Sequence, residues 1–467
     1  MTKIKQRLAL LALVFLATIA YAQTADGLAP EIANEIDAAV TEILVETGVP
    51  SASVAVVREG AIAWTKAYGL ARLDPPTPAT KTMRYPIGSI SKQFTAAAVA
   101  MLAADGKLSL DDTVADFFPD LTRADDITLR QLLSHTAGIR DYWPQDYVPQ
   151  TMLEPITTEA LINQWARQPL DFEPGSKYQY SNTGYVIAGA IVEKVSGESL
   201  MEFLRERIFA PLGMDSVTDI DQGTLAPGDA TGYQRFALGP PRPAPKEGKG
   251  WLFAAGPLAM TAVDLAKWNL SLIEDNVPGP AVFDELTREV VLTNGTGTGY
   301  GLGVGVALEG DRRVVGHGGE VSGFTATNRV YPEERAAIVV LANQDAANAA
   351  PAIAKKIAEL LFVSASPSDA EMLVRVSGIL NGLKKGRLDR SLFTPNGNGY
   401  FSEAALVDIK ASLKRLGSLK EIKQIRQSLR GGLTTRVYRA VFKKTTLEIV
   451  TRAAADGKLE QYTLSVE

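Results

Sequence analysis

The chain has 467 residues, of which 46% are hydrophobic and 22% charged, a composition typical of globular proteins with a large buried core. This length predicts two or three domains at about 150 residues each. Two histidines and no cysteine exclude disulfides and a zinc site of the usual His/Cys type. From Ser366 onward the chain holds 18 Lys and Arg against 10 Asp and Glu, whereas the formal net charge of the whole is −5. The main body is therefore acidic, which argues against nucleic acid as a partner.

The first 22 residues have the three parts of an export signal. Basic residues open it, residues 8–20 are apolar, and Ala20-Tyr21-Ala22 is a small-x-small cleavage site. The apolar run is short for a membrane span, and no comparable stretch follows. We expect residues 1–22 to be a signal peptide cleaved after Ala22, leaving a bacterial protein that is periplasmic or secreted without stable membrane insertion. An uncleaved N-terminal anchor is the alternative.

Residues 30–362 are expected to form one domain in which strands flank a long helical segment. The expected elements are a helix at 30–47, strands at 51–57 and 61–68, a helix opening near Ser89, helices at 128–134, 158–166, 183–195 and 200–209, a loop at 227–250, a helix at 262–273, strands at 301–308, 312–315, 325–331 and 336–342, and a helix at 346–361. The simplest packing joins the two β-rich ends in one antiparallel sheet flanked by helices, with a large helical lobe beside it. This is an α+β fold. The glycine-rich stretch 295–305 fits no G-x-G-x-x-G register and is expected to be a loop entering a strand.

A second, smaller α+β domain is expected at the C-terminus. Residues 363–368 form a linker of mostly small residues, and the domain occupies residues 369–467. Its expected elements are helices at 370–385 and 403–416 and strands at 422–429, 435–442, 446–453 and 459–466, with hairpin turns at Gly431-Gly432 and Asp456-Gly457. Two helices before a curved sheet resemble NTF2-like domains. No motif here names a ligand, so docking on the main domain, dimerisation and shielding of a cleft all stay open.

Ser89 and Lys92 form an S-x-x-K motif where an alanine-rich helix begins. Three residues are almost one helical turn, so the two side chains project from the same face. A serine hydroxyl becomes a nucleophile when a neighbouring group takes its proton, and a lysine one turn away can do so. The positive end of the helix adds to this effect. The motif alone is weak evidence, because chance gives one or two matches in a chain of this size.

Three further segments carry groups suited to a site. Tyr180-Ser181-Asn182 follows a Pro-Gly turn and precedes a helix, so its side chains lie at a loop–helix junction. His317-Gly318-Gly319 is placed at the end of a β run, where its glycines allow a substrate backbone to approach closely. His135 ends a helix far along the chain from the other motifs, and we expect it to be structural.

In this order and with these long spacings, Ser89-x-x-Lys92, Tyr180-x-Asn182 and His317-x-Gly319 resemble the three signature elements of the serine beta-lactamase-like hydrolases. That group holds class C beta-lactamases, D-stereospecific peptidases and carboxypeptidases, and related esterases. The resemblance covers residues 30–362. Three ordered motifs are far more specific than any one of them.

The resemblance implies acyl transfer to water through an acyl-enzyme, on a small-molecule or peptide substrate, with no metal and no organic cofactor. Ser89 would be the nucleophile, and Lys92 and Tyr180 would take its proton and return one to the leaving group. Asn182, His317, Gly318 and Gly319 would orient the substrate or, for Asn182, the lysine. The backbone N–H groups of Ser89 and Glu320 would form the oxyanion hole.

One departure from the beta-lactamase pattern bears on the substrate. Those enzymes carry Lys-Thr/Ser-Gly where this chain has His317-Gly318-Gly319, so the carboxylate-binding lysine is missing. This favours small esters, amides or peptides, as in the D-aminopeptidase and esterase branches. Beta-lactamase or D-Ala carboxypeptidase activity is the alternative within the same family. A non-catalytic envelope-binding protein is the alternative from another class, although it would not need all three reactive side chains. The choice between ester and amide and the formation of a homo-oligomer stay open.

Overall fold

The computed structural model describes residues 27–309, 312–362, 369–430, 433–454 and 457–467. The expected signal peptide with its cleavage site, the expected linker, and the hairpin-turn residues Gly431, Gly432 and Asp456 lie outside the described residues. Within the described ranges, no helix is both long enough and apolar enough to cross a bilayer.

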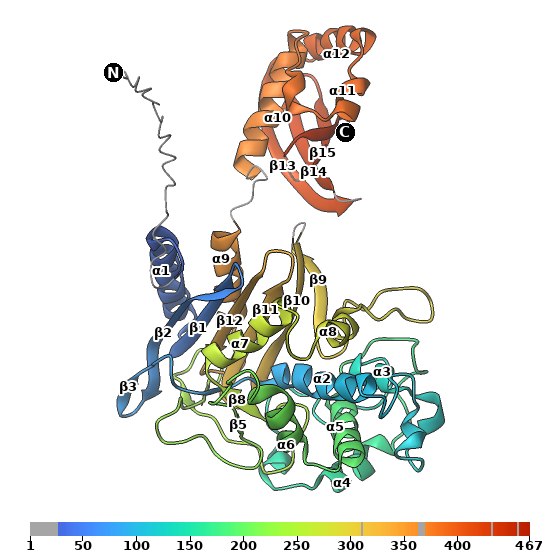
Figure 1. Cartoon of the computed structure of the whole chain (residues 1–467). Helices are drawn as coiled ribbons and strands as arrows, with labels where there is room; N and C mark the ends of the chain where they lie inside the picture. The colour runs from blue at the N-terminus through green and yellow to red at the C-terminus, as the bar shows by residue number, and fades with distance from the viewer. Residues whose placement is uncertain (1–26, 310–311, 363–368, 431–432, 455–456) are drawn as a thin grey trace, which may run out of the picture.

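A seven-stranded sheet in the order β3-β2-β1-β12-β11-β10-β9 forms the centre of the main domain (Figure 1). Its strands are β1 (Ser51–Arg58), β2 (Ala61–Leu73), β3 (Pro76–Pro78), β9 (Gly305–Glu309), β10 (Arg312–Val321), β11 (Phe324–Tyr331) and β12 (Ala336–Ala342). All its pairings are antiparallel, and β1 pairs with β12 so that Ala52 lies opposite Ala342. The expectation that the two β-rich ends meet in one antiparallel sheet is confirmed.

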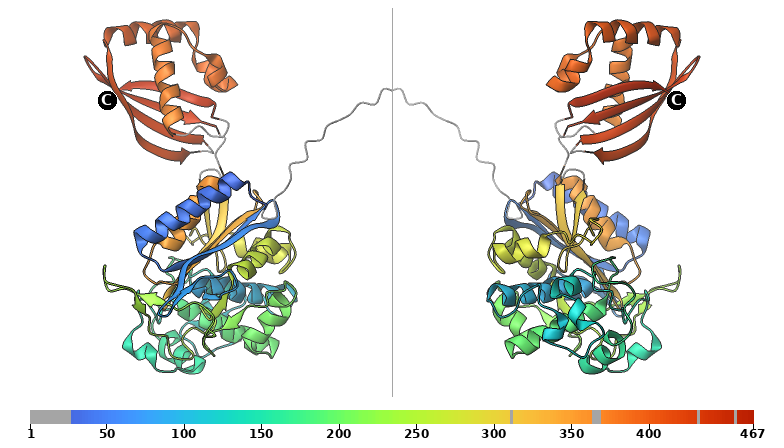
Figure 2. Two further views of the ribbon diagram at one scale, coloured as in Figure 1. Left: turned by 90° about the vertical axis from the view of Figure 1, so that its left-hand side faces the viewer. Right: turned by 90° about the vertical axis from the view of Figure 1, so that its right-hand side faces the viewer.

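Both faces of this sheet are buried. Because successive side chains of a strand point to opposite sides, neighbouring residues belong to different cores. Val54 and Val56 belong to the core beneath α1 (Pro30–Thr47) and α9 (Ala349–Leu361). Ala55 and Val57 belong instead to the larger core that the sheet shares with α7 (Ala262–Ile273) and the helical lobe. The figures show α1 and α9 together on one face of the sheet and α7 on the other (Figures 1 and 2).

The helical lobe lies between β3 and β9 in the chain. Its helices are α2 (Ser91–Ala104), α3 (Leu129–Leu133), α4 (Thr158–Leu161), α5 (Asn182–Ser196), α6 (Leu200–Leu204) and α8 (Pro280–Thr287), with shorter turns η1 (Gly88–Ile90), η2 (Val114–Asp116), η3 (Ala124–Asp126) and η4 (Gln150–Leu153) and π-helical turns η5 (Ile162–Ala166) and η6 (Arg205–Phe209). Short strands complete it: β4 (Tyr85–Pro86), β5 (Thr218–Asp219), β6 (Tyr233–Gln234), β7 (Arg242–Pro243) and β8 (Leu258–Met260). The helix α8 was not among the expected elements, because its short apolar pattern follows a loop rich in Pro and Gly.

The C-terminal part is an α+β unit with its own core. It contains α10 (Asp369–Lys384), η7 (Arg390–Leu392), α11 (Pro395–Tyr400), α12 (Glu403–Arg415) and the antiparallel strands β13 (Leu419–Arg430), β14 (Leu433–Phe442), β15 (Thr446–Ala453) and β16 (Leu459–Val466). Buried residues from α10 and the sheet, such as Val376, Tyr438 and Tyr462, pack together. The α+β class and the four-stranded sheet are as expected, whereas α11 was not predicted; the likeness to NTF2-like domains stays a prediction.

Candidate active site

Ser89 lies between the short strand β4 and helix α2. The tight turn η1 runs directly into α2, so Ser89 and Lys92 lie on one face, as their spacing predicts. The Lys92 Nζ is 2.9 Å from the Ser89 Oγ. Lys92 has no exposed surface, because α2 is buried along most of its length. The two side chains of the S-x-x-K motif are therefore in hydrogen-bond contact inside the protein.

Three oxygen atoms surround the Lys92 amine. Besides the Ser89 Oγ, they are the Asn182 Oδ1 and the carbonyl oxygen of Ala255, each 2.8 Å from Nζ. A neutral amine has two hydrogens and one lone pair, so it can donate to these two oxygens while it accepts the Ser89 proton. Burial lowers the pKa of Lys92 to about 7, although the charge of Asp141 opposes the shift. The amine can therefore accept a proton near neutral pH.

Asp141 fixes the orientation of the Asn182 amide. The Asn182 Nδ2 donates to both carboxylate oxygens, at 3.1 and 3.2 Å, and the Asn182 backbone N–H donates to the Oδ1 at 3.0 Å. Because the amide nitrogen is held by Asp141, the amide oxygen faces Lys92. The carboxylate is itself mostly buried, and this burial raises its pKa. Asp141 thus acts on Lys92 twice, through Asn182 and through its charge.

Replacing Asp141 by asparagine is expected to move the acidic limb of the pH–rate profile to lower pH. The carboxylate charge favours the protonated lysine, so its removal lowers the pKa of Lys92 below about 7. The measurement is kcat/KM for a p-nitrophenyl ester across the acidic and neutral range. The exposed Asp215, changed to asparagine in the same way, is the matched control and should leave the limb in place. A limb that moves to higher pH in the Asp141 variant would contradict this account of the lysine.

Tyr180 projects into the site from the loop just before α5. Its hydroxyl is buried and lies beside the Ser89 hydroxyl. The Lys92 Nζ lies over its ring, 4.9 Å from the centroid. Burial raises the pKa of the Tyr180 phenol above its ordinary value, and the nearby Ser89 hydroxyl opposes the rise. The phenol is therefore protonated at neutral pH, so burial suits Lys92 to accept a proton and Tyr180 to donate one.

Both histidines of the chain lie behind Tyr180 and share one phenol, that of Tyr300. The Ser181 N–H donates to the His135 Nδ1 at 3.1 Å, so the proton of His135 is on Nε2, which lies 3.3 Å from the Tyr300 oxygen. The Tyr300 hydroxyl then donates to the His317 Nε2 at 2.8 Å, and the His317 Nδ1–H donates to the Gly318 carbonyl oxygen. Each of these three side chains therefore donates one hydrogen bond and accepts one.

Both imidazoles are neutral in this arrangement. Burial together with the Lys92 charge lowers the pKa of His317 to about 4 and holds that of His135 well below its usual range. The ring of His135 packs against Tyr180 with 4.1 Å between centroids. Although His135 is far from the other motifs along the chain, the fold places its ring against Tyr180, and its structural role stays a prediction.

Two glycines allow β10 to lie against the Ser89 turn. A side-chain carbon on Gly319 would lie 1.9 Å from the Ile87 carbonyl oxygen, and one on Gly88 would lie 2.6 Å from the Glu320 nitrogen. Gly88 also has a positive φ of 50°, which other residues rarely adopt. The Glu320 backbone nitrogen consequently lies close to Gly88, the residue before Ser89, and its part in an oxyanion hole stays a prediction. The strand β10 runs on to Val321, so His317-Gly318-Gly319 lies within it and not at its end.

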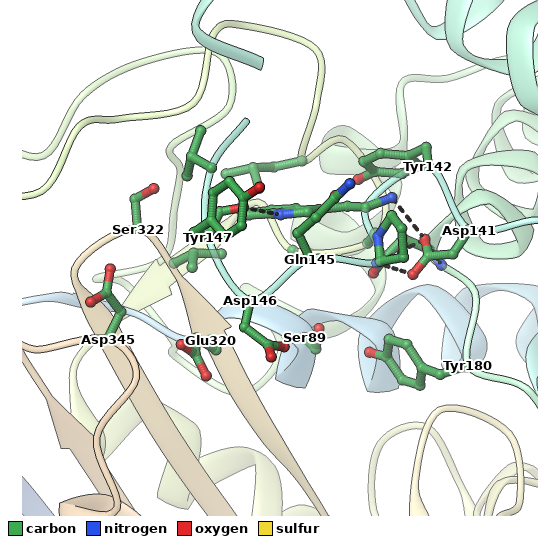
Figure 3. A pocket seen from close by; sticks show the side chains of 18 of the residues that line it. Ser89, Asp141, Tyr142, Gln145, Asp146, Tyr147, Tyr180, Glu320, Ser322 and Asp345 are labelled. Carbon is green, nitrogen blue, oxygen red and sulfur yellow. Dashed lines mark hydrogen bonds between the residues drawn. The ribbon is translucent and has the colours of Figure 1, made fainter. Parts of the chain in front are cut away.

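A cavity of about 500 Å³ opens in front of Ser89 (Figure 3). Of the expected site residues, Ser89, Tyr180, Asn182 and Glu320 line it, whereas Lys92 lies beneath and His317, Gly318 and Gly319 are not part of its wall. The segment from Asp141 to Val148 forms one side, with the aromatic rings of Trp143 and Tyr147. The space is large enough for a small acyl group and its leaving group. Within the described ranges, no group of three or more His, Cys, Asp and Glu is placed to hold a metal ion.

The sequence profile named Beta-lactamase matches residues 36–361, more than two thirds of the chain. The chain belongs to the beta-lactamase family. A D-aminopeptidase of Brucella anthropi is 29% identical over 298 residues, which are 63% of this chain and 56% of that protein. The protein Flp of Staphylococcus aureus strain MW2 is 26% identical over 66% of this chain and 63% of its own length. The chain thus matches little more than half of these curated relatives.

Solved structures show the same fold. A D-stereospecific amidohydrolase from a Streptomyces species superposes with a TM-score of 0.61 and 26% identity, covering 71% of this chain and 98% of its own. A D-amino acid amidase from Ochrobactrum anthropi SV3 gives 0.62 and 25%, covering 71% and 97%. An octameric penicillin-binding protein homologue from Pyrococcus abyssi gives 0.60 at 23% identity, over 92% of this chain and 99% of that one, and shows the fold alone. With its family established, this protein is a serine hydrolase, and the resemblance read from the three motifs is confirmed.

Two residues of this family member's site were missed at the sequence level. Asp141 follows the helix-ending run of residues 132–138 by three positions, and its place next to that run was the available signal. Tyr300 lies in the glycine-rich loop before β9, where no local pattern separates it from a core aromatic residue. Both act through other side chains, Asn182 and His317, so spacing between the motifs could not reveal them.

Proposed function

We propose that this protein is an exported serine hydrolase that cleaves small amides, esters or peptides through an acyl-enzyme. The observation that carries the proposal is the Lys92 Nζ at 2.9 Å from the Ser89 Oγ, in a fully buried position that lowers the pKa of Lys92 to about 7. A lysine with this pKa can take the serine proton at the moment of attack.

The reaction follows from the contacts around Ser89. The neutral Lys92 amine accepts the hydroxyl proton as the Ser89 Oγ attacks the substrate carbonyl carbon, and the N–H groups of Ser89 and Glu320 stabilise the oxygen anion. The Tyr180 hydroxyl gives its proton to the departing nitrogen or oxygen, and the proton on Lys92 returns to the phenolate. Water then attacks the ester formed on Ser89 with the same groups in reversed roles, which releases the acid.

The names of two relatives support amides as substrates, since one is a D-aminopeptidase and another a D-amino acid amidase. Because this chain matches only 56% of the D-aminopeptidase, its own substrate is part of the proposal. Localisation in the periplasm or outside the cell rests on the sequence pattern of residues 1–22.

The proposal is tested by covalent labelling of the nucleophile. A fluorophosphonate probe should label the protein once, and the mass shift should fall on the peptide that contains Ser89. The Ser89→Ala variant should stay unlabelled, whereas Ser91→Ala, the same change two residues away, should be labelled. Labelling at another residue, or no labelling under conditions in which an ester is hydrolysed, would overturn Ser89 as the nucleophile.

A further inference from the structure

The turn that joins β10 to β11 lies directly beyond Glu320 and Val321. It consists of Ser322-Gly323, and Val321 lies opposite Phe324. Because a two-residue hairpin closes on a hydrogen-bonded pair, Val321 bonds to Phe324 and the Glu320 N–H points away from β11. On that side, the pairing of β10 with the described part of β9 ends at Gly316. The edge of β10 at Glu320 is therefore open toward η1, against which it lies.

Two carboxylates from separate segments hold this turn by its backbone. The Glu247 Oε1 accepts the Ser322 N–H at 3.0 Å and the Ser322 hydroxyl at 2.8 Å. The Asp345 Oδ2, just after β12, accepts the N–H of the next residue, Gly323, at 2.9 Å. Ser322, Asp345 and Glu320 lie together on one side of the cavity (Figure 3). Consecutive N–H groups of the turn are thus each bonded to a different carboxylate.

Glu247 is itself held firmly in place. Only 5% of its surface is exposed, and burial raises its pKa, while the bonds from Ser322 oppose the rise. A buried carboxyl group is costly unless hydrogen bonds compensate, and the two donors of Ser322 supply such bonds. The N–H of the following residue, Gly248, donates to the Met152 carbonyl oxygen at 2.7 Å, which fixes the backbone beside Glu247. The carboxylate therefore offers the turn a fixed partner.

Two further hydrogen bonds tie the end of the hairpin to its surroundings. The Ala346 N–H donates to the Glu320 Oε1 at 2.8 Å, and the Tyr233 N–H donates to the Gly323 carbonyl oxygen at 3.2 Å. The tip of a hairpin is usually the most mobile part of its two strands. A donor to an oxygen anion, however, is effective only when its position is fixed within a fraction of an ångström. A turn two residues from Glu320 that is held in this way meets that need.

We propose that Glu247 and Asp345 are positioning residues for the oxyanion hole. By holding the turn, they keep the N–H of Glu320 directed at the carbonyl oxygen of a substrate bound at Ser89. Both act through the backbone of the turn. This inference rests on the proposed function, in which Glu320 supplies one of the two N–H groups, and deepens it by naming what fixes that donor.

The test compares a ligand that forms an oxygen anion with one that does not. In phenylethyl trifluoromethyl ketone, the Ser89 Oγ adds to the carbonyl carbon, the C=O π bond opens to an anion, and the serine proton passes to Lys92. The secondary alcohol made by reducing this ketone has nearly the same shape and forms no bond to Ser89. Calorimetry gives the ratio of the two affinities in each variant. The natural protein should prefer the ketone, and Ser89→Ala should lose that preference.

Glu247→Ala and Asp345→Ala are each expected to lower this ratio about tenfold or more, because the donor of Glu320 is no longer fixed. Glu247→Gln and Asp345→Asn keep an oxygen that accepts from the turn, so they should retain the ratio within about threefold. Asp215→Asn, at an exposed position, is the matched control and should leave it unchanged. The affinity for the alcohol should be the same in all of these variants.

Alanine variants that keep the natural ratio, or that lose affinity for both ligands alike, would overturn the inference. Asp345 is only partly buried, so Asp345→Ala provides the test even where Glu247→Ala fails to fold. A natural protein whose preference for the ketone does not depend on Ser89 would overturn the proposed function and the inference with it. A preference that depends on Ser89 but not on Glu247 and Asp345 would overturn the inference alone.

Discussion

Replacing Ser89 by alanine, Lys92 by methionine, or both at once is expected to lower kcat/KM by about the same factor, roughly 1,000-fold or more. The two side chains are joined by a 2.9 Å hydrogen bond and act in one step, so the loss of either removes the whole step. Methionine matches the length of the lysine stem and cannot accept the proton at neutral pH. The measurement is kcat/KM of the three variants on one p-nitrophenyl ester. A double variant that is much worse than either single variant would show that the two residues contribute separately.

The same lysine variant should change how stability depends on pH. Folding lowers the pKa of Lys92 from 10.5 to about 7, so between these values the unfolded chain binds the extra proton and the folded chain does not. Stability from this group therefore rises as pH increases through that window, by up to roughly 1.4 kcal/mol per pH unit. Below about pH 7 both states are protonated, and this dependence vanishes.

Urea unfolding at neutral and at alkaline pH measures this difference. The natural protein should gain stability relative to Lys92→Met on going from about pH 7 to about pH 9. Lys107→Met, at an exposed position, is the matched control and should show no such relative change. If the natural protein shows no gain in stability relative to Lys92→Met, or a loss, then Lys92 keeps its proton in the folded state. The role of Lys92 as base would then be wrong.

The sheet and the nucleophile could be predicted from sequence because their signals are local or repeat along the chain. The run of small and β-branched residues in β1 and the helical spacing in α7 are set by the residues themselves, and α7 begins and ends at the predicted positions. The S-x-x-K spacing likewise needs only the geometry of one helical turn. Asp141 contacts Asn182, which is 41 residues away in the chain, and Tyr300 contacts His317, which is 17 residues away. No local sequence pattern encodes such contacts. Glu320 and Asp345 line one cavity only because the sheet places β10 and β12 on either side of β11.

Tyr180→Phe is expected to slow amide cleavage about 100-fold or more and to affect an activated ester far less. The Tyr180 hydroxyl is protonated and aimed into the cavity, which suits it to protonate a leaving group. An aniline nitrogen must be protonated as it leaves, whereas p-nitrophenolate departs as a stable anion. The measurement is kcat/KM for a p-nitroanilide and a p-nitrophenyl ester of the same acyl group.

The ratio of the two rates separates this role from a structural one. Loss of packing would slow both substrates alike, because the same acyl-enzyme is formed from each. Tyr178→Phe is the matched control, since this neighbouring phenol is part of the aromatic cluster but does not line the cavity. Equal losses on both substrates in Tyr180→Phe would assign leaving-group protonation to Lys92 alone. A selective loss on the amide would instead assign the role of base to Lys92 and that of acid to Tyr180. These are the roles that burial favours, because it lowers the pKa of Lys92 and raises that of Tyr180.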